Sequence, residues 1–257
     1  MESLLEEITV NTIYSYLIVF CRVGSMFTTI PGIGEVYVAV RSRLLMALAV
    51  SIVISPAVLI YVPKIPDHIA TLFSIIFIEV TIGIFYGILV RILINSLHTA
   101  GFIISAQSGL SAALFFDPNQ GAQATSIGSL YTTLAITLFL STNLHHSVIQ
   151  GLLESFQTLQ PGVFINVGDF TSSIIDIIGK SFSIAFKISA PVVIIAFLVL
   201  TGAGILSRLM PGMQVFFVLT PIQILICFFV ILSTISATMM WYLNLIGEYL
   251  SNFYLGK

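Results

Sequence analysis

Long apolar runs alternate with short polar breaks along the chain. Most of the runs contain about 20 residues or more, the length that an α-helix needs to cross a bilayer. They cover residues 8–30, 44–62, 69–94, 125–143, 183–206 and 213–250. Prolines and glycines mark several of the breaks, as at Pro31-Gly32 and Pro161-Gly162. The pattern predicts an all-α, polytopic protein of about six to eight apolar helices.

Polar residues and prolines inside the runs predict that several helices are kinked or broken. The polar patch at 95–99 predicts a break before a half-helix over 100–116, because one helix over 69–116 would be about 70 Å long at 1.5 Å per residue. Pro191 and Pro221 predict kinks in the last two helices. The composition shifts near 161–182, and we therefore expect a front part, 1–160, and a C-terminal helical hairpin, 161–257.

The composition excludes a soluble globular domain and favours an integral membrane protein. Of the 257 residues, 58% are hydrophobic and 8% are charged, whereas about 25% of the residues in an average soluble domain are charged. The net charge of −2 gives no basis for nucleic-acid binding. Cys21 and Cys227 lie in apolar runs, where buried thiols are expected. No nucleophile, metalloprotease or phosphate-loop motif occurs, so we expect neither an enzyme nor a bound cofactor.

The stretch 100–123 combines features that rarely occur together. Small residues recur at every fourth position, which lets another helix approach closely; they are Gly101, Ser105, Gly109 and Ala113. Leu114, Phe115 and Phe116 follow, and Asp117-Pro118 ends the helix. The aromatic tip fits two interpretations equally well, a movable hydrophobic constriction and ordinary core packing.

Arg22 and Glu79 are single charges within apolar runs. Each costs about 2.5–3.5 kcal/mol at a bilayer centre on insertion scales, so neither should be left unpaired. A proton or ion pathway is one interpretation. We prefer a structural one, in which the two residues form a buried pair. Gly83 and Gly87 follow Glu79 as a GxxxG packing face.

His145-His146 is the most obvious candidate for a metal or proton-relay site. Adjacent residues point about 100° apart on a helix, so both rings cannot easily bind one ion. No third ligand follows at helical spacing. The sequence therefore favours polar caps at the end of a span and predicts no metal site.

Short motifs occur in a fixed order over nearly the whole chain. They are Arg22, Pro31-Gly32, Arg41-Ser42-Arg43, Glu79 to Gly83 with Gly87, Gln107-Ser108-Gly109-Leu110, Phe115-Phe116-Asp117-Pro118, Asn143 to His146, Ser155-Phe156, Pro161-Gly162, Arg208 to Pro211, Gln214-Val215-Phe216 and Pro221. Together they resemble the FliR family, a subunit of the flagellar type III protein-export gate with counterparts in virulence injectisomes. The chain departs from that family at Ala39 (usually proline), Leu144 (often glycine), Gly212 (usually glutamine), Leu219 (often glycine) and Gln223 (often lysine).

The resemblance implies a definite architecture and function. Residues 1–160 would resemble FliP, with a plug loop near 109–123, and residues 161–257 would resemble FliQ. Such a subunit joins FliP-like and FliQ-like subunits in a helical hetero-oligomer, with FlhB and FlhA as further partners. The assembly lies in the bacterial inner membrane, within the ring of the flagellar basal body, and passes unfolded flagellar proteins. The resemblance makes a set of residues candidates for the channel plug: Gly109, Leu110, Leu114, Phe115, Phe116, Asp117 and Pro118.

Two other classes of function stay open on the residues alone. A secondary transporter of a small solute would use discontinuous helices to build a site at the membrane midplane. A purely structural assembly nucleator would have no gating loop, and it would seal normally without residues 110–120.

Overall fold

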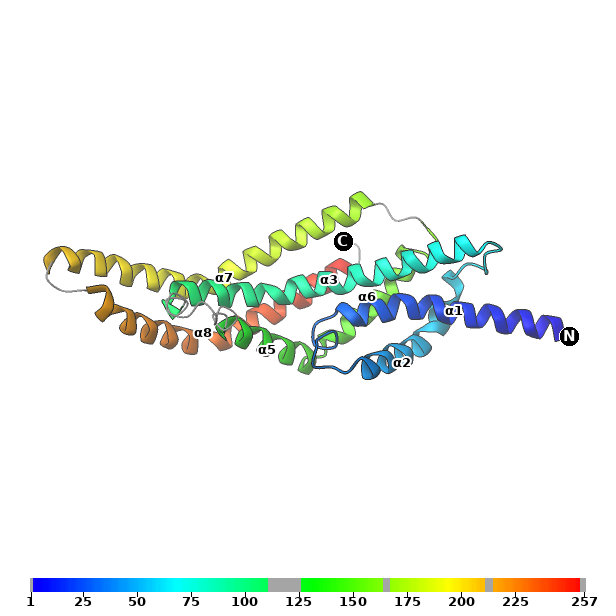
Figure 1. Cartoon of the computed structure of the whole chain (residues 1–257), viewed down its shortest axis with the longest axis horizontal. Coiled ribbons are helices and arrows are strands. Elements are labelled where there is room, and N and C mark those ends of the chain that lie inside the picture. The colour runs from blue at the N-terminus through cyan, green and yellow to red at the C-terminus, as the bar shows by residue number, and fades with distance from the viewer. Residues whose placement is uncertain (1, 111–125, 164–166, 211–214, 255–257) are drawn as a thin grey trace. The chain divides into compact units, whose positions relative to one another are not determined.

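The computed structural model describes residues 2–110, 126–163, 167–210 and 215–254. Seven α-helices and one short 3₁₀ helix, η1 (Leu59–Tyr61), lie in these ranges, and no strand occurs there (Figure 1). The α-helices are α1 (Glu2–Thr29), α2 (Val40–Val58), α3 (Ile69–Gln107), α5 (Ser126–Ser141), α6 (Leu144–Thr158), α7 (Val167–Leu209) and α8 (Val215–Tyr254). The all-α prediction is confirmed for the described residues.

Five of the described helical segments are long and apolar enough to cross a membrane. They are Val10–Thr29, Val40–Tyr61, Ile69–Gln107, Val167–Leu209 and Val218–Leu250. α5 and α6 together could form a sixth span, with a bend of 71° between them. Asn143 lies at this bend with a φ of 59°, a left-handed conformation that asparagine adopts more often than most residues. The chain therefore has the helices of a polytopic membrane protein.

The expected break near 95–101 is wrong, because α3 is a continuous helix from Ile69 to Gln107. The polar side chains there bond to their own helix and do not interrupt it. Ser96 Oγ donates to the Leu93 carbonyl at 2.6 Å, and Thr99 Oγ1 donates to the Asn95 carbonyl at 3.2 Å. Hydroxyls that are satisfied one turn back can lie within an apolar helix at little cost.

The last two helices also continue past their prolines. α7 contains Pro191 within its 43 residues, and α8 contains Pro221 within its 40 residues. Proline removes one main-chain hydrogen bond, and membrane helices tolerate this where neighbouring groups satisfy the freed carbonyl. Both arms of the predicted terminal hairpin are thus long helices.

The chain folds into two compact units. The first comprises residues 1–92, 139–177 and 247–257, and the second comprises residues 93–138 and 178–246. In the first unit, Tyr14 and Ile18 of α1 pack with Ile75 of α3 in a buried cluster. This core holds the N-terminal helices together. The division of the sequence at residue 161, which concerns relatedness to other subunits, stays a prediction.

The second unit has its own core. Ile104 of α3, Tyr131 of α5 and Tyr242 of α8 are buried almost completely. The hydroxyl of Tyr242 donates a 3.0 Å hydrogen bond to the carbonyl of Leu93. A buried tyrosine with a satisfied hydroxyl fits the general pattern for polar groups inside apolar protein.

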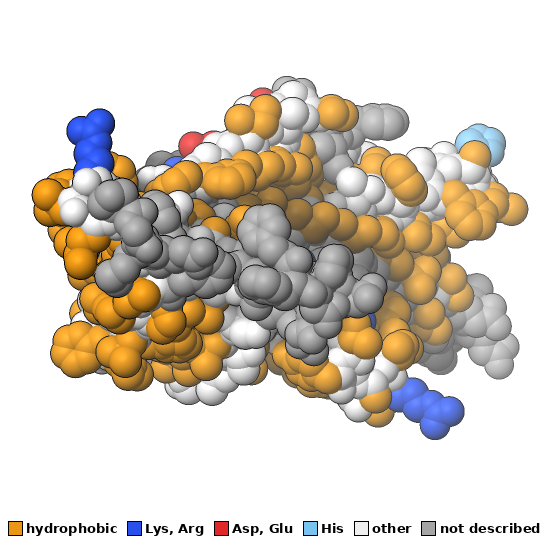
Figure 2. All heavy atoms as spheres, turned by 60° about the vertical axis from the view of Figure 1, so that its left-hand side comes forward, with side chains coloured by type: hydrophobic (Ala, Val, Ile, Leu, Met, Phe, Trp, Pro, Cys, Tyr) orange, Lys and Arg blue, Asp and Glu red, His pale blue; other side chains and the backbone are white. Residues whose placement is uncertain are grey.

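Large apolar side chains also cover much of the described surface. Figure 2 shows a face on which hydrophobic side chains predominate and charged side chains are isolated. On α8, Leu225, Phe229 and Leu232 are 70%, 71% and 73% exposed. Soluble monomers rarely expose contiguous apolar patches larger than a few hundred Å². This surface is suited to contact with lipid or with other apolar protein.

Candidate functional site

The most polar buried feature of the first unit is an ion pair between α1 and α3. Arg22 Nε lies 2.6 Å from Glu79 Oε2, and Arg22 Nη2 lies 3.0 Å from Glu79 Oε1. Both side chains are 0% exposed. The structure therefore brings together the two single charges that the sequence indicated as partners, in a bidentate arrangement that suits guanidinium and carboxylate.

Arg22 also binds the C-terminal end of α6. Its Nη1 donates to Ser155 Oγ at 3.0 Å, and its Nη2 donates to the Leu159 carbonyl at 2.8 Å. The guanidinium lies 3.9 Å from the centre of the Phe156 ring. The last carbonyls of a helix lack partners within the helix and carry partial negative charge, so a cation is favoured there. One side chain thus connects α1, α3 and α6.

The pair has the features of a structural element. Isolated charges are costly in an apolar interior, whereas a paired and hydrogen-bonded set keeps the region neutral and leaves few polar atoms unsatisfied. Four hydrogen bonds hold the guanidinium, which leaves it little freedom to move. Tyr14, two turns earlier on α1, has a buried hydroxyl without a partner among the described residues. The four hydrogen bonds that fix Arg22 favour the interpretation of Arg22 and Glu79 as a helix-positioning pair over a proton pathway.

Gly83 and Gly87 bring α1 and α3 close together beside the ion pair. A Cβ added at Gly83 would collide with Ser25 Oγ and with the carbonyl of Arg22. A Cβ added at Gly87 would collide with Thr29 and lie 3.0 Å from the Met26 carbonyl. The GxxxG face therefore lies directly against α1, in the way that small residues allow in membrane helices.

A second close helix contact involves the small-residue row of α3. A Cβ added at Gly101 would collide with the backbone of Gly128 on α5 and lie 2.9 Å from the carbonyl carbon of Ile127. Ser105, the next member of the row, is buried. Ala113 lies outside the described residues. Gly101, the first member of the row, thus packs α3 against α5.

The α3 helix ends immediately before the predicted plug. Gly109 has a φ of +83°, the left-handed conformation in which glycine commonly follows a helix. Gln223 of α8 donates from its amide to the Gln107 carbonyl at 2.7 Å. Of the plug candidates, Gly109 and Leu110 lie among the described residues. The other five, which are Leu114, Phe115, Phe116, Asp117 and Pro118, lie outside them.

Sequence reasoning identified Gln223 only as a departure from the family pattern and missed its contact; the side chain is 7% exposed and satisfies a carbonyl at the end of α3. It also predicted no hydrogen-bond partner for Arg43, whose guanidinium donates to the Ile33 and Glu35 carbonyls at 3.1 and 2.8 Å. Gln223 lies two residues after Pro221 within α8, and Arg43 lies in the first turn of α2, which are weak signals. Their partners are backbone carbonyls, which no sequence pattern identifies.

The two histidines lie against each other at the start of α6. The ring centroids of His145 and His146 are 4.2 Å apart. Within the described ranges, no group of three His, Cys, Asp or Glu side chains could hold a metal ion. The histidine pair thus gives a metal site no support in this part of the chain.

Comparison with known proteins identifies the family. The pattern of the family described as bacterial export proteins, family 1, matches residues 13–249. The flagellar biosynthetic protein FliR of Bacillus subtilis is 34% identical over 230 residues, which cover 86% of each chain. FliR of Caulobacter vibrioides is 31% identical over 234 residues, covering 91% of this chain and 93% of that one. The Yop proteins translocation protein T of Yersinia pestis is 26% identical over 227 residues, covering 86% and 85%. The chain therefore belongs to the FliR family of bacterial export proteins.

Proposed function

We propose that this chain is a channel-forming subunit of the flagellar type III export gate, through which unfolded flagellar proteins cross the inner membrane. The main support for this proposal is the match over residues 13–249 to a family of export proteins. The similar proteins carry flagellar and Yop-translocation names. The family consists of export components and not of enzymes, so the subunit provides a passage and a seal and catalyses no reaction.

The proposed partners are FliP-like and FliQ-like subunits, FlhB and FlhA, assembled within the basal-body ring. In this proposal residues 1–160 take the place of a FliP-like part, and residues 161–257 form a FliQ-like hairpin. Support comes from the exposed apolar side chains of α7 and α8, such as Phe197 at 68% and Phe229 at 71%. Such faces need lipid or neighbouring subunits to cover them.

The proposed plug comprises Gly109, Leu110 and the apolar tip at Leu114, Phe115 and Phe116, followed by Asp117-Pro118. Bulky apolar side chains at a narrow neck exclude water and ions, while a passing polypeptide can displace them. Support comes from the fixed base of this segment. Gln223 holds the carbonyl of Gln107, and Gly109 directs the chain out of the helix.

The test is the ion conductance of the assembled complex. Phe115→Ala with Phe116→Ala is expected to raise the resting ion leak while leaving assembly intact. The matched control is Phe73→Ala with Phe77→Ala, two aromatic residues one helical turn apart on α3 that are 67% and 73% exposed. An unchanged leak in the first variant, with normal assembly, would remove the two phenylalanines from the seal.

The partner proposal has a separate test. The tagged chain, co-expressed with FliP-like and FliQ-like proteins and purified in detergent, is expected to elute as one hetero-oligomer. A stable lone monomer or homodimer, indifferent to those proteins, would favour the transporter alternative, which gains no support from the family match.

A further inference from the structure

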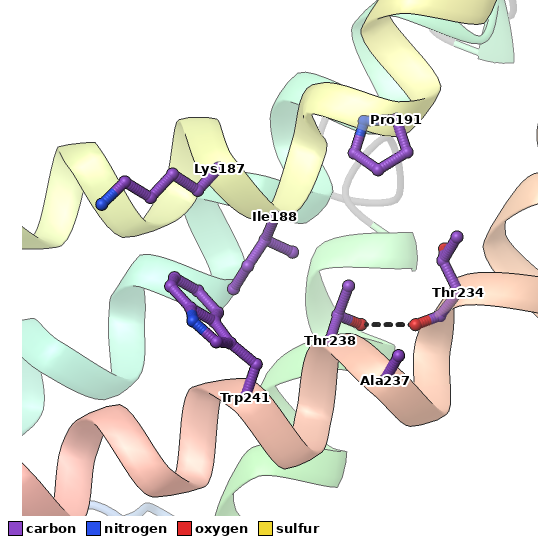
Figure 3. Close-up of a pocket in the computed structure, with 7 residues that line it drawn as sticks. All are labelled: Lys187, Ile188, Pro191, Thr234, Ala237, Thr238 and Trp241. Carbon is purple, nitrogen blue, oxygen red and sulfur yellow. Dashed lines mark hydrogen bonds between the residues drawn. The ribbon is translucent and has the colours of Figure 1, made fainter.

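The second unit contains a groove between α7 and α8, with a volume of about 280 Å³. Figure 3 shows its lining, with Lys187, Ile188 and Pro191 on α7 facing residues of α8. The α8 residues are Thr234, Ala237, Thr238 and Trp241. The walls are mainly apolar, and Lys187 is the one charged residue among those that line the groove.

The groove offers hydrogen-bond donors without an acidic partner. Two threonine hydroxyls are already used within α8. Thr234 Oγ1 donates to the Val230 carbonyl at 2.8 Å, and Thr238 Oγ1 donates to the Thr234 carbonyl at 3.0 Å. Lys187 is exposed and has neither a hydrogen bond nor an ion pair with any residue that the structure describes. The ammonium of Lys187 and the indole N–H of Trp241 are therefore left to bind an acceptor, and the ammonium selects an anion.

The position of Lys187 along α7 indicates the depth in a bilayer at which the groove would lie. Between Lys187 and Arg208 the helix carries no charged residue. At 1.5 Å per residue, the 21 steps between the two span about 32 Å, close to the roughly 30 Å thickness of the hydrocarbon core of a bilayer. Lys187 and Arg208 are thus spaced to lie at its two boundaries.

The side chains at the Lys187 end have the character of a membrane boundary. In Figure 3 the Lys187 side chain extends along α7 away from Pro191, toward the outer end of the uncharged segment. Lysines near the ends of membrane helices extend in this way to reach the headgroups. Trp241 lies beside the same level of α7 and is 38% exposed. Tryptophan is enriched at this depth of a bilayer.

We propose that the groove binds an anionic phospholipid of the surrounding membrane. The phosphate accepts from the Lys187 ammonium and the Trp241 indole, and an acyl chain lies along Ile188, Pro191 and Ala237. Basic pockets between membrane helices recognise anionic lipid headgroups by this combination of charge and apolar walls. The site does not depend on the proposed export function.

Trp241 provides a direct test, because it is the one tryptophan of the chain. The full chain is reconstituted in phosphatidylcholine bilayers that contain brominated phosphatidylglycerol or brominated phosphatidylcholine, and quenching of Trp241 fluorescence reports occupancy of the groove. We expect brominated phosphatidylglycerol to occupy the groove about fivefold more readily, the preference that one lysine near a membrane surface supplies. In Lys187→Gln the two lipids should quench equally.

The controls separate the groove from general effects of charge and folding. Arg208→Gln removes one exposed positive charge from the other end of the uncharged segment and should keep the preference, as should Lys187→Arg. The proposal is overturned if the wild-type chain shows no preference, if the preference survives Lys187→Gln, or if Arg208→Gln also abolishes it. Absence of quenching by either lipid would mean that protein covers the groove. Loss of the preference for brominated phosphatidylglycerol in millimolar inorganic phosphate would mean that the groove binds a free anion. Each of these last two results also overturns the lipid proposal.

Discussion

Removal of either partner from the Arg22–Glu79 pair is expected to destabilise the protein strongly. Glu79→Leu leaves the guanidinium buried at 0% exposure, with only Ser155 Oγ and the Leu159 carbonyl as acceptors. Arg22→Met leaves a buried carboxylate without its bidentate donor. Breaking a buried pair in this way typically costs about 3–5 kcal/mol. At about 2–4 °C per kcal/mol for a chain of this size, the midpoint of thermal unfolding should fall by about 6–20 °C.

The double variant Arg22→Met/Glu79→Leu distinguishes a pair from two independent residues. With both charges gone, no buried charge is left unpaired, and replacement of a buried ion pair by apolar residues is often close to neutral. The double variant should therefore be more stable than the sum of the two single losses predicts, although Ser155 and Leu159 still lose their donor. The assay is thermal unfolding of the purified chain in detergent, for all four proteins of the cycle. Additivity within about 0.5 kcal/mol would refute the reasoning.

The same unit supplies a matched control. Arg91 Nη2 lies 3.2 Å from Glu35 Oε1, with side chains that are 38% and 25% exposed. Solvent screens such a pair, and exposed pairs typically contribute less than about 1 kcal/mol. Arg91→Met and Glu35→Leu should therefore shift the midpoint much less than the changes at the buried pair. Equal shifts of the unfolding midpoint at both pairs would show that burial does not decide how much stability is lost when an ion pair is broken.

Two further predictions concern helix contacts. Gly87→Val should destabilise the chain by about 1–3 kcal/mol in the same unfolding assay, because the valine side chain would collide with Thr29. The control is Gly202→Ala, which should be neutral or slightly stabilising because an added Cβ there meets no atom within 4 Å. Gln223→Leu should speed hydrogen exchange at the last turn of α3, because an unsatisfied carbonyl costs about 1–3 kcal/mol. Gln223→Lys keeps a donor, so the amides of the last turn of α3 should exchange more slowly in this variant than in Gln223→Leu. Equal rates in the two variants would contradict the role of Gln223 as the donor to this carbonyl.

The sequence predicted the helices well because apolar runs of membrane length carry a strong signal. It failed where a polar residue can be either a break or a satisfied member of a helix. The pattern around Ser96 and Thr99 favours a break, yet each hydroxyl donates to a carbonyl of α3 itself. Composition cannot distinguish these two cases, because the same residues favour both turns and bonds back to the preceding turn.

The polar contacts show the same division: the sequence could predict some of them and not others. Arg22 and Glu79 could be paired in advance, because each is a charge that needs a partner in an apolar run. The remaining acceptors of Arg22, Ser155 Oγ and the Leu159 carbonyl, could not, since a hydroxyl and a main-chain carbonyl carry no such requirement in the sequence.

Gln223 shows why a departure from the family pattern need not remove a contact. The sequence has glutamine where FliR-like proteins often have lysine, which looks like the loss of a charge. The structure places the Gln223 amide 2.7 Å from the carbonyl of Gln107, at the C-terminal end of α3. Such a carbonyl needs a donor, and a neutral amide supplies one as a lysine would. In this chain the end of α3 next to the predicted plug is therefore held by hydrogen-bond donation, which does not require a positive charge at position 223.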